Sequence, residues 1–170
     1  MIPEIKTEFV AICEHDDWYA RNHLEIALQQ LNTDQRLLAA GSITLRYYHV
    51  GQRKYITMGN RGSALCNTVM RSEALTMLSC AARKAAITSD RGVDRLFWLS
   101  IQSRRQCLHR INTVVGIKGL PGRPGIGIGH RPDHRRAWRD DPNLDQLRKW
   151  IGADCENYRA IEFGRKAGAA

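Results

Sequence analysis

The alternation of apolar and polar residues predicts β-strands at two places in the first third of the chain. Alternation is weak over residues 4–13. It is clear over residues 43–50 and 53–58, two segments rich in β-branched and aromatic residues that flank Gly51-Gln52. A turn that begins with glycine is typical of a type II′ hairpin. The sequence therefore predicts one β-hairpin, preceded by a short strand.

Apolar residues recur at helical spacing through most of the remaining chain. We expect helices over residues 17–31, 33–40, 63–87, 93–115, 144–151 and 153–163. Asp16 or Asp17 would cap the first helix, and Gly41 fits the glycine that ends the second. Ser72 could start a fresh helix within 63–87, and Gly152 separates the last two helices.

Residues 96–111 allow two interpretations. The segment can be one amphipathic helix with a basic solvent face. Alternatively, Ser103 and Gln106 form a capping box that starts a new helix, which gives a helix-turn-helix. Arg104 and Arg105 would then stand at the exposed start of a recognition helix, where arginine reads guanine in the major groove.

Residues 116–140 have a different composition. Six glycines and three prolines are interleaved there with arginines, which neither a helix nor a sheet interior tolerates. We expect a basic flexible loop or arm over 116–140 and a frayed tail over 164–170. The fold class expected for the chain is α+β and predominantly helical, with one β-hairpin, a candidate helix-turn-helix and the arm. Residues 1–170 are expected to form a single domain, the default at this length.

The charge distribution adds a candidate function. The chain of 170 residues has 26 Lys and Arg against 17 Asp and Glu, a net charge of +9. Residues 1–40 carry −4, residues 41–140 carry +13, and residues 141–170 are neutral. A binding surface for a polyanion gives a reason for this segregation, although acidic ends that fold back to neutralise a basic middle would give the same numbers.

Two further segments fit a nucleic-acid surface. Basic and tyrosine side chains are interleaved in the hairpin, which suits a ribbon that enters a groove or stacks bases, although tyrosines on a half-buried sheet are also common for packing alone. Arginines at intervals in the 116–140 arm suit contacts to the phosphate backbone. The arm can equally be an irregular surface loop or a protein-binding segment.

We therefore expect a nucleic-acid-binding protein, with duplex DNA as the leading target, that acts as a regulatory or accessory factor, for example in transcription. The alternative is a protein-interaction module, an inhibitor or adaptor, that docks its basic surface on an acidic protein or a ribonucleoprotein. The candidate nucleic-acid-binding residues are Arg46, Arg53, Lys54, Arg61, Arg104, Arg105, Arg110, Lys118, Arg123, Arg131, Arg135, Arg136 and Arg139.

Catalytic and metal-binding signatures are few. The chain has no Walker A motif, no His-Glu-x-x-His and no Gly-x-Ser-x-Gly. Glu14, Asp16 and Asp17 beside His15 could hold Mg²⁺ for a nuclease, but a helix cap explains them more simply. We expect no enzyme activity, no cofactor and no metal, with a small metal-dependent nuclease as the remoter alternative.

The compartment is inferred from cysteines and hydropathy. The five cysteines are widely spaced, which favours reduced, buried thiols over a disulfide framework. No apolar run approaches the length of a membrane span, and the first residues do not resemble a secretion signal. The expectation is a cytoplasmic protein, or a nuclear one in a eukaryote, without a membrane partner.

Overall fold

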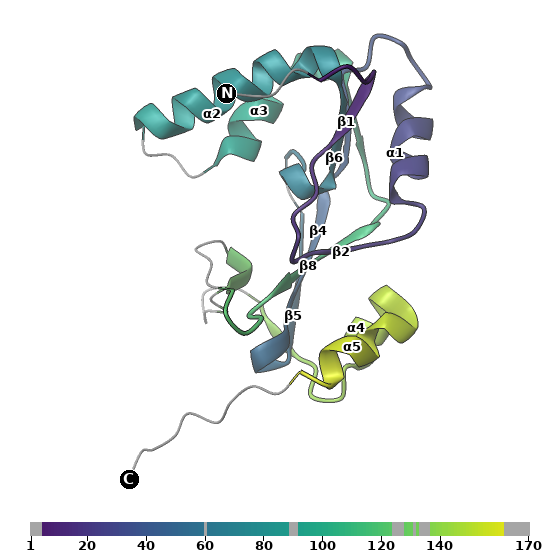
Figure 1. Ribbon diagram of the computed structural model, residues 1–170, viewed down its shortest axis with the longest axis vertical. Coiled ribbons are helices and arrows are strands. Elements are labelled where there is room, and N and C mark those ends of the chain that lie inside the picture. The colour runs from purple at the N-terminus through teal and green to yellow at the C-terminus, as the bar shows by residue number, and fades with distance from the viewer. Residues whose placement is uncertain are drawn as a thin grey trace. The chain divides into compact units, whose positions relative to one another are not determined.

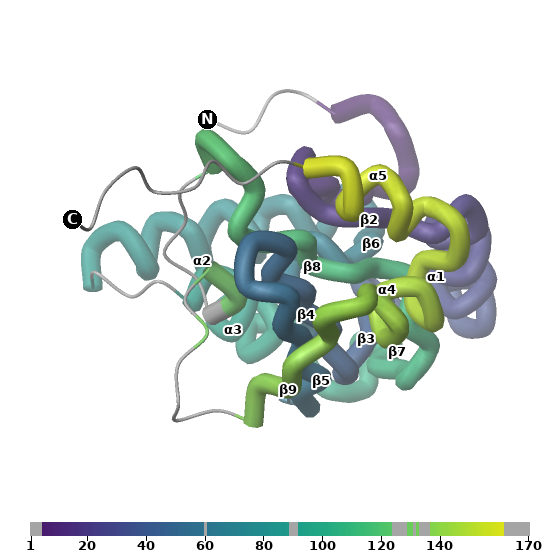
Figure 2. The backbone as a smooth tube through the Cα atoms, turned by 90° about the horizontal axis from the view of Figure 1, so that it is seen from below, coloured from purple at the N-terminus to yellow at the C-terminus, as the bar shows by residue number. Residues whose placement is uncertain are grey.

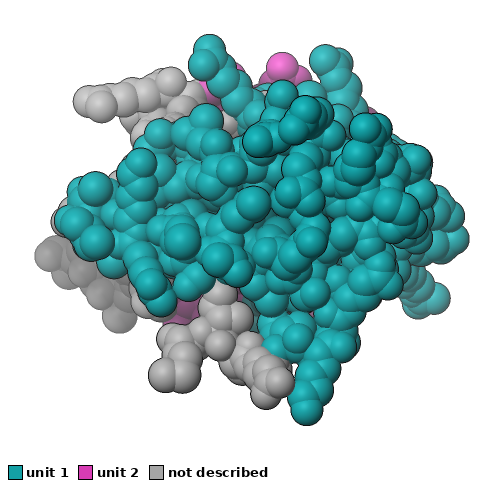
Figure 3. All heavy atoms as spheres, turned by 90° about the horizontal axis from the view of Figure 1, so that it is seen from above, with its two compact units in different colours: residues 1–15, 19–45, 58–114 teal, residues 16–18, 46–57, 115–170 magenta. Residues whose placement is uncertain are grey.

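The computed structural model describes residues 5–59, 61–88, 92–123, 128–130, 132 and 137–161. The chain forms two compact units, which Figure 3 colours separately. Unit 1 comprises residues 1–15, 19–45 and 58–114, and unit 2 comprises residues 16–18, 46–57 and 115–170. Each unit is described by itself below.

Unit 1 contains a four-stranded sheet in the order β1-β6-β3-β7. Its strands are β1 (Phe9–Ala11), β3 (Ala39–Ser42), β6 (Thr68–Arg71) and β7 (Gln106–His109). The β1–β6 and β3–β6 pairs are antiparallel, whereas β3 and β7 run parallel. The sheet is therefore mixed, and β7 forms one of its edges.

Helices cover both faces of this sheet: α1 (His23–Leu31) on one side, and α2 (Leu75–Thr88) and α3 (Val93–Ser100) on the other (Figure 1). Val69 packs with residues of α1, while the next residue, Met70, packs with residues of α2 and α3. Ala40 and Ala39 of β3 divide between the two faces in the same way. Successive strand residues point to opposite faces, so in a sheet that is buried on both sides consecutive positions of a strand are buried.

The second sheet is five-stranded, in the order β2-β8-β4-β5-β9. Its strands are β2 (Trp18–Tyr19), β4 (Thr44–His49), β5 (Lys54–Gly59), β8 (Val114–Lys118) and β9 (Arg139–Asp140). Strand β5 lies between β4 and β9 (Figure 2). In unit 2, α4 (Asp145–Ile151) and α5 (Cys155–Arg159) contribute Leu147, Ile151 and Cys155 to a core that includes Tyr48 and Ile117.

Short 3₁₀ helices connect several of these elements. They are η1 (Val50–Gln52), η2 (Leu65–Asn67), η3 (Ser72–Ala74), η4 (Ser103–Arg105), η5 (Ile128–His130) and η6 (Gly152–Asp154). No helix among the described residues is long and apolar enough to cross a membrane.

The expectation of a predominantly helical chain with one β-hairpin is wrong. The protein is an α+β structure in which nine strands form two mixed sheets within the described ranges. Two segments assigned to helices contain buried strands instead: residues 33–40 lead into β3, and residues 63–87 begin with η2 and β6. All four residues of each strand are buried, so neither strand shows the alternation of apolar and exposed polar residues that distinguishes a strand from a helix.

The predicted helix-turn-helix is also wrong. Helix α3 ends at Ser100, and the residues assigned to a recognition helix form η4 and the strand β7. The Gln106 side chain does not join a capping box with Ser103. Its Nε2 donates hydrogen bonds to the backbone oxygens of Trp98 (2.7 Å) and Ile101 (2.6 Å), so it caps the C-terminal end of α3.

The expected arm over 116–140 begins as regular structure. Strand β8 is buried at all five positions from Val114 to Lys118, and β9 lies near the other end of the segment. Much of the remainder, together with the tail over 164–170, lies outside the described residues. Gly116 lies within this buried strand. A side chain does not fit there, because an added Cβ would lie 2.5 Å from Cδ1 of the Tyr47 ring.

Other predictions match the structure. The two hairpin arms correspond to β4 and β5, and the final helix pair corresponds to α4 and α5, separated at Gly152 with φ +63°. The cysteines are free as expected, but only Cys66 and Cys155 are buried, whereas Cys13 and Cys80 are exposed. The single domain over 1–170 stays a prediction.

Gly41 provides a test of the packing in unit 1. A Cβ on Gly41 would lie 2.5 Å from Ser63 Cβ and 3.0 Å from Trp98 Cζ2, within β3. We expect Gly41→Ala to lower the free energy of unfolding by about 1–3 kcal/mol, because the buried neighbours must shift. Chemical denaturation followed by circular dichroism measures the change.

Gly59→Ala is the matched control. Gly59 is exposed at the end of β5, and nothing lies within 4 Å of the added Cβ. Its unfolding free energy should change by less than about 0.5 kcal/mol. Equal stability of the two variants would contradict the packing of Ser63 and Trp98 against β3.

Candidate nucleic-acid interface

Three arginines of unit 1 line one cavity of about 420 Å³: Arg36, Arg104 and Arg105. Arg104 and Arg105 belong to η4, directly before β7. Arg36 comes from the loop that connects α1 to β3. The parallel pairing of β3 with β7 brings these distant segments together, and the Leu38 N–H donates to the Arg105 oxygen at 2.8 Å.

Arg36 is held in an exposed turn by Asp34. The backbone N–H of Arg36 donates to Asp34 Oδ1 at 2.9 Å, and its Nη2 donates to Oδ2 at 2.7 Å. The Arg36 side chain is 83% exposed. The turn therefore fixes the base of the side chain while the guanidinium faces solvent.

Arg105 and Arg104 are fixed by neighbours of their own. Arg105 Nε donates to the backbone oxygen of Arg36 at 3.1 Å, and its Nη2 donates to Glu73 Oε1, also at 3.1 Å. Arg104 Nε donates to Gln102 Oε1 at 3.1 Å. The Nη1 groups of Arg36, Arg104 and Arg105 make no hydrogen bond to a described residue, so each guanidinium keeps donors for a ligand.

A fourth arginine, Arg71, supports the loop from beneath. It is 7% exposed, and its Nε donates to the Leu37 oxygen at 3.1 Å while its Nη2 donates to Gln35 Oε1 at 3.0 Å. Its Nη1 pairs with Glu8 Oε1 at 2.5 Å. Arg71 is thus a positioning residue for the loop that presents Arg36, because a buried guanidinium needs all of these partners.

The charge balance of the cavity is positive but partly compensated. Three guanidinium groups face two carboxylates, Asp34 and Glu73. The hydrogen bonds from Arg36 lower the pKa of Asp34 from 3.8 to about 2, so this carboxylate is ionised at neutral pH. The arrangement can accept an oxyanion that bridges the guanidinium groups.

Six of the described candidate residues lie in unit 2, and four of them belong to the hairpin or to β9. The Arg46 guanidinium stacks over the Trp150 ring at 5.3 Å, and Lys54 Nζ pairs with Asp140 Oδ1 at 2.8 Å. Arg53 has a left-handed backbone with φ 51°, and its Nη1 is buried. Arg139 is exposed on β9. The hairpin is not a free ribbon: its Tyr48 ring is fully buried and β4 pairs in parallel with β8.

Lys118 is not part of an exposed surface. Its side chain is 6% exposed, and Nζ donates to Asp17 Oδ1 at 2.6 Å and to Asp16 Oδ2 at 3.4 Å within unit 2. A buried ammonium needs such carboxylates, since an unpaired charge in the interior costs several kcal/mol. The expectation that Asp16 or Asp17 caps a helix is therefore wrong; α1 begins after Asn22.

Three of the remaining candidate residues are described and three are not. Arg110 follows β7, Arg61 lies between β5 and η2, and Arg123 follows β8, all exposed. Arg61 lines a second cavity in unit 1. Arg131, Arg135 and Arg136 lie outside the described residues.

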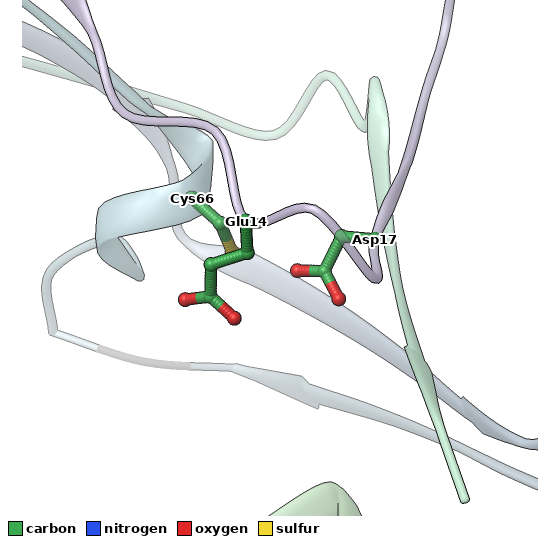
Figure 4. A group of neighbouring side chains, drawn as sticks. All are labelled: Glu14, Asp17 and Cys66. Atoms are coloured by element: carbon green, nitrogen blue, oxygen red, sulfur yellow. The ribbon is translucent and has the colours of Figure 1, made fainter. Parts of the chain in front are cut away.

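The acidic segment considered for Mg²⁺ divides between the units. Glu14 and Cys66 lie in unit 1, on the loop after β1 and on η2, with ligand atoms within 4.8 Å of each other (Figure 4). Asp17, drawn in the same view, belongs to unit 2 and pairs there with Lys118. Within unit 1 the group offers one carboxylate and one thiol, and a thiol is not a ligand that Mg²⁺ prefers.

Sequence reasoning missed Arg36 and its partners. Arg36 lies in the N-terminal segment whose net charge is −4, so counting charge by region hides it. The local signal was Asp34-x-Arg36, because an aspartate two residues ahead of a backbone N–H is typical of an Asx turn. No protein-family model matches this chain, and no curated protein is similar to it in sequence.

The Asp34–Arg36 pair gives a prediction on pH. Removing the guanidinium in Arg36→Ala should raise the pKa of Asp34 from about 2 towards 3.8. Because the pair lowers the folded-state pKa, its stabilisation is present above pH 3.8 and is lost as the pH falls through about 2. Carboxyl ¹³C NMR titration of Asp34 measures the shift.

Arg104→Ala is the control for this titration. Arg104 donates to Gln102 and makes no hydrogen bond to Asp34. The pKa of Asp34 should stay low in this variant. An Asp34 that titrates near 3.8 in the wild-type protein would contradict the turn described above.

Proposed function

We propose that the protein binds nucleic acid, and that Arg36, Arg104 and Arg105 contact its backbone phosphates. The observation that carries the proposal is the cavity of about 420 Å³ lined by these three side chains. Arginine suits this role because its planar guanidinium forms two parallel hydrogen bonds to a phosphate.

The anchoring of the arginines supports binding rather than a purely structural role. Asp34 and Glu73 each hold one guanidinium by the Nη2 side and leave Nη1 available to a ligand. A donor held in place before binding loses less conformational entropy when a ligand arrives. The carboxylates thus lower the net charge of the site while they preorganise it.

The wider charge distribution agrees with a polyanionic ligand. Residues 41–140 carry a net charge of +13, and further arginines of unit 1 are exposed, among them Arg61, Arg95 and Arg110. Contacts to phosphates fix a protein on nucleic acid without reading its sequence. We therefore propose backbone binding as the common activity, in a regulatory or accessory role.

Duplex DNA remains the first target to test. The argument from a recognition helix no longer applies, since residues 103–109 form η4 and β7. Single strands carry the same phosphates, so a single-stranded oligonucleotide of equal length is the necessary comparison. The two differ in salt dependence, with a slope of about −0.9 per phosphate contact for duplex and about −0.7 for single strands.

The experiment is a salt series of fluorescence anisotropy with the full chain and a labelled random-sequence duplex. We expect the logarithm of the binding constant to fall linearly with the logarithm of salt concentration. Arg104→Ala should weaken binding about fivefold at low salt and reduce the magnitude of the slope by about 1, because one phosphate contact is lost.

Arg83→Ala is the control with the same change in net charge. Arg83 is exposed on α2 and does not line the cavity. An equal loss in the two variants would mean that only net charge matters, and the proposed site would be refuted. A polyglutamate peptide that binds as tightly as the duplex, with the same loss in Arg104→Ala, would replace nucleic acid by an acidic protein as the partner.

A further inference from the structure

A cluster of polar side chains fixes the start of α1 in unit 1. His23, the first residue of α1, is 5% exposed. Its Nδ1 lies 2.7 Å from Oγ1 of the buried Thr113, in the segment that joins β7 to β8. The backbone connects the same two segments, because the Ala20 N–H donates to the Thr113 oxygen at 2.8 Å. Thr113 therefore ties the beginning of α1 to the segment that follows β7.

The second nitrogen of the His23 imidazole has no partner. Nε2 is buried and makes no hydrogen bond to a described residue. The Tyr19 ring makes an edge contact with the imidazole, with 5.3 Å between the ring centroids. An imidazolium carries a proton on both nitrogens. A charged His23 would therefore bury an N–H and a positive charge without a partner, which is strongly unfavourable.

A second histidine, His109, faces α1 from the edge strand β7. Cys107 lies on the same strand two residues earlier, and its Sγ is 3.5 Å from Gln30 Oε1 of α1. Alternate residues of a strand point to the same face, so His109 also lies on the side of the sheet that α1 covers. Its Nδ1 accepts a hydrogen bond from the Ile111 N–H at 3.2 Å, and the neutral ring therefore carries its proton on Nε2.

The other titratable groups packed around α1 in unit 1 do not balance a charge on His23. They are Tyr19 on β2, Cys107 on β7, Arg110 after β7 and Arg71 on β6, whereas β1 and β3 add none. Arg71 lies at the opposite end of α1, where its Nη2 donates to the Leu31 oxygen at 3.5 Å. Burial raises the pKa of the Cys107 thiol, which stays neutral. The N-terminal end of a helix also disfavours a cation, because its N–H groups carry a partial positive charge.

Two carboxylates belong to neighbouring segments, and neither pairs with His23. Glu25 of α1 is exposed, and its Oε1 accepts a hydrogen bond from Gln29 of the same helix at 3.3 Å. Glu14 donates its backbone N–H to Tyr19 Oη at 2.8 Å, but its carboxylate lies beside η2. A proton on His23 thus has no counter-ion among the described residues.

The two histidines are shifted in the same direction. Burial lowers the pKa of His23 below its ordinary value of 6.5, and repulsion by His109 lowers it further. Burial also lowers the pKa of His109. Both rings are more basic in water than in the closed structure, so separation of α1 from β7 takes up protons in mild acid. The contact is therefore strongest above pH 6.5 and weakens as the pH falls below that value.

We propose that His23, Thr113 and His109 form an acid-sensitive contact, which holds the start of α1 against the β7 edge of the sheet at neutral pH and opens in mild acid. The opening is local: the hydrogen bond from Ala20 to Thr113 breaks, while α2 stays folded. The proposal does not depend on nucleic-acid binding, because none of these residues lines the arginine cavity of the candidate interface.

The first test is a pH titration of the imidazole ¹H–¹³C NMR signals of the full chain. We expect His23 and His109 to titrate below pH 6.5. His109→Gln should bring the titration of His23 closer to 6.5, because it removes the repulsion and leaves the burial. His15→Gln is the matched control, since His15 is exposed on the loop after β1, and it should leave the His23 titration unchanged.

The second test is native-state amide hydrogen exchange, with each rate divided by the intrinsic rate at the same pH. The protection of the Ala20 N–H should fall about tenfold between about pH 7.5 and about pH 5.5, since opening takes up a proton. The N–H of Ala81, buried in α2, should stay at least about tenfold better protected than that of Ala20 at the lower pH. Equal protection of the two would mean that Ala20 exchanges only by global unfolding, and local opening would be overturned.

His23→Gln separates the proton from the hydrogen bond. Glutamine can still bond to Thr113 but takes up no proton, so the protection of Ala20 should become nearly independent of pH. A fall as large as in the wild-type protein would rule out His23 as the sensor. The wild-type titration decides the question even if this variant does not fold, because a His23 that titrates at or above pH 6.5 contradicts the proposal. A His23 titration that is the same in His109→Gln as in His15→Gln would remove His109 from the contact.

Discussion

The parallel pairing of β3 with β7 is the constraint on which both cavities of unit 1 depend. It joins Ala39–Ser42 to Gln106–His109 and continues at both ends, where the Leu38 N–H donates to Arg105 and the Ile43 N–H donates to His109. Ahead of the paired residues it places the Arg36 loop beside η4. At its first residue it brings Gln106 to the end of α3, where the side-chain amide replaces the missing helical donors. One strand pair thus sets the position of residues that are 69 apart along the chain.

Local signals in the sequence were sufficient for some of the fold. The hairpin arms and the last two helices follow from residue type and from Gly152, whose backbone has φ +63°. The strands β3 and β6 could not be identified in the same way, because all four residues of each are buried and neither strand has an exposed polar face. Gly41 shows the difficulty. In the sequence it resembles a glycine that ends a helix, yet it lies within β3, where Ser63 and Trp98 leave no room for a side chain. That reason becomes visible only when distant residues are placed.

The candidate site could also be predicted only in part, because it depends on contacts between residues far apart in the sequence. Arg104 and Arg105 stand out by charge alone, although their expected helix does not form. Arg36 could not be linked to them before the β3–β7 pairing was known. Lys118 shows the opposite error, since counting charges takes no account of burial, and this ammonium forms ion pairs with Asp16 and Asp17 in the interior of unit 2. A count of charged residues along the chain indicates a binding surface only after the residues in buried ion pairs are left out of the count.

The position of β7 at the edge of its sheet has a consequence for self-association. An edge strand offers unpaired backbone groups to a second copy of the chain, and proteins protect such edges with short strands and charged residues. Strand β7 has four residues, with Arg104 and Arg105 before it and Arg110 after it. If two copies paired antiparallel about the middle of β7, Arg105 of each would lie opposite Arg110 of the other, and like charges in that position repel. The arginines that flank β7, two of which we propose to contact phosphates, would therefore also disfavour edge-to-edge pairing of two copies.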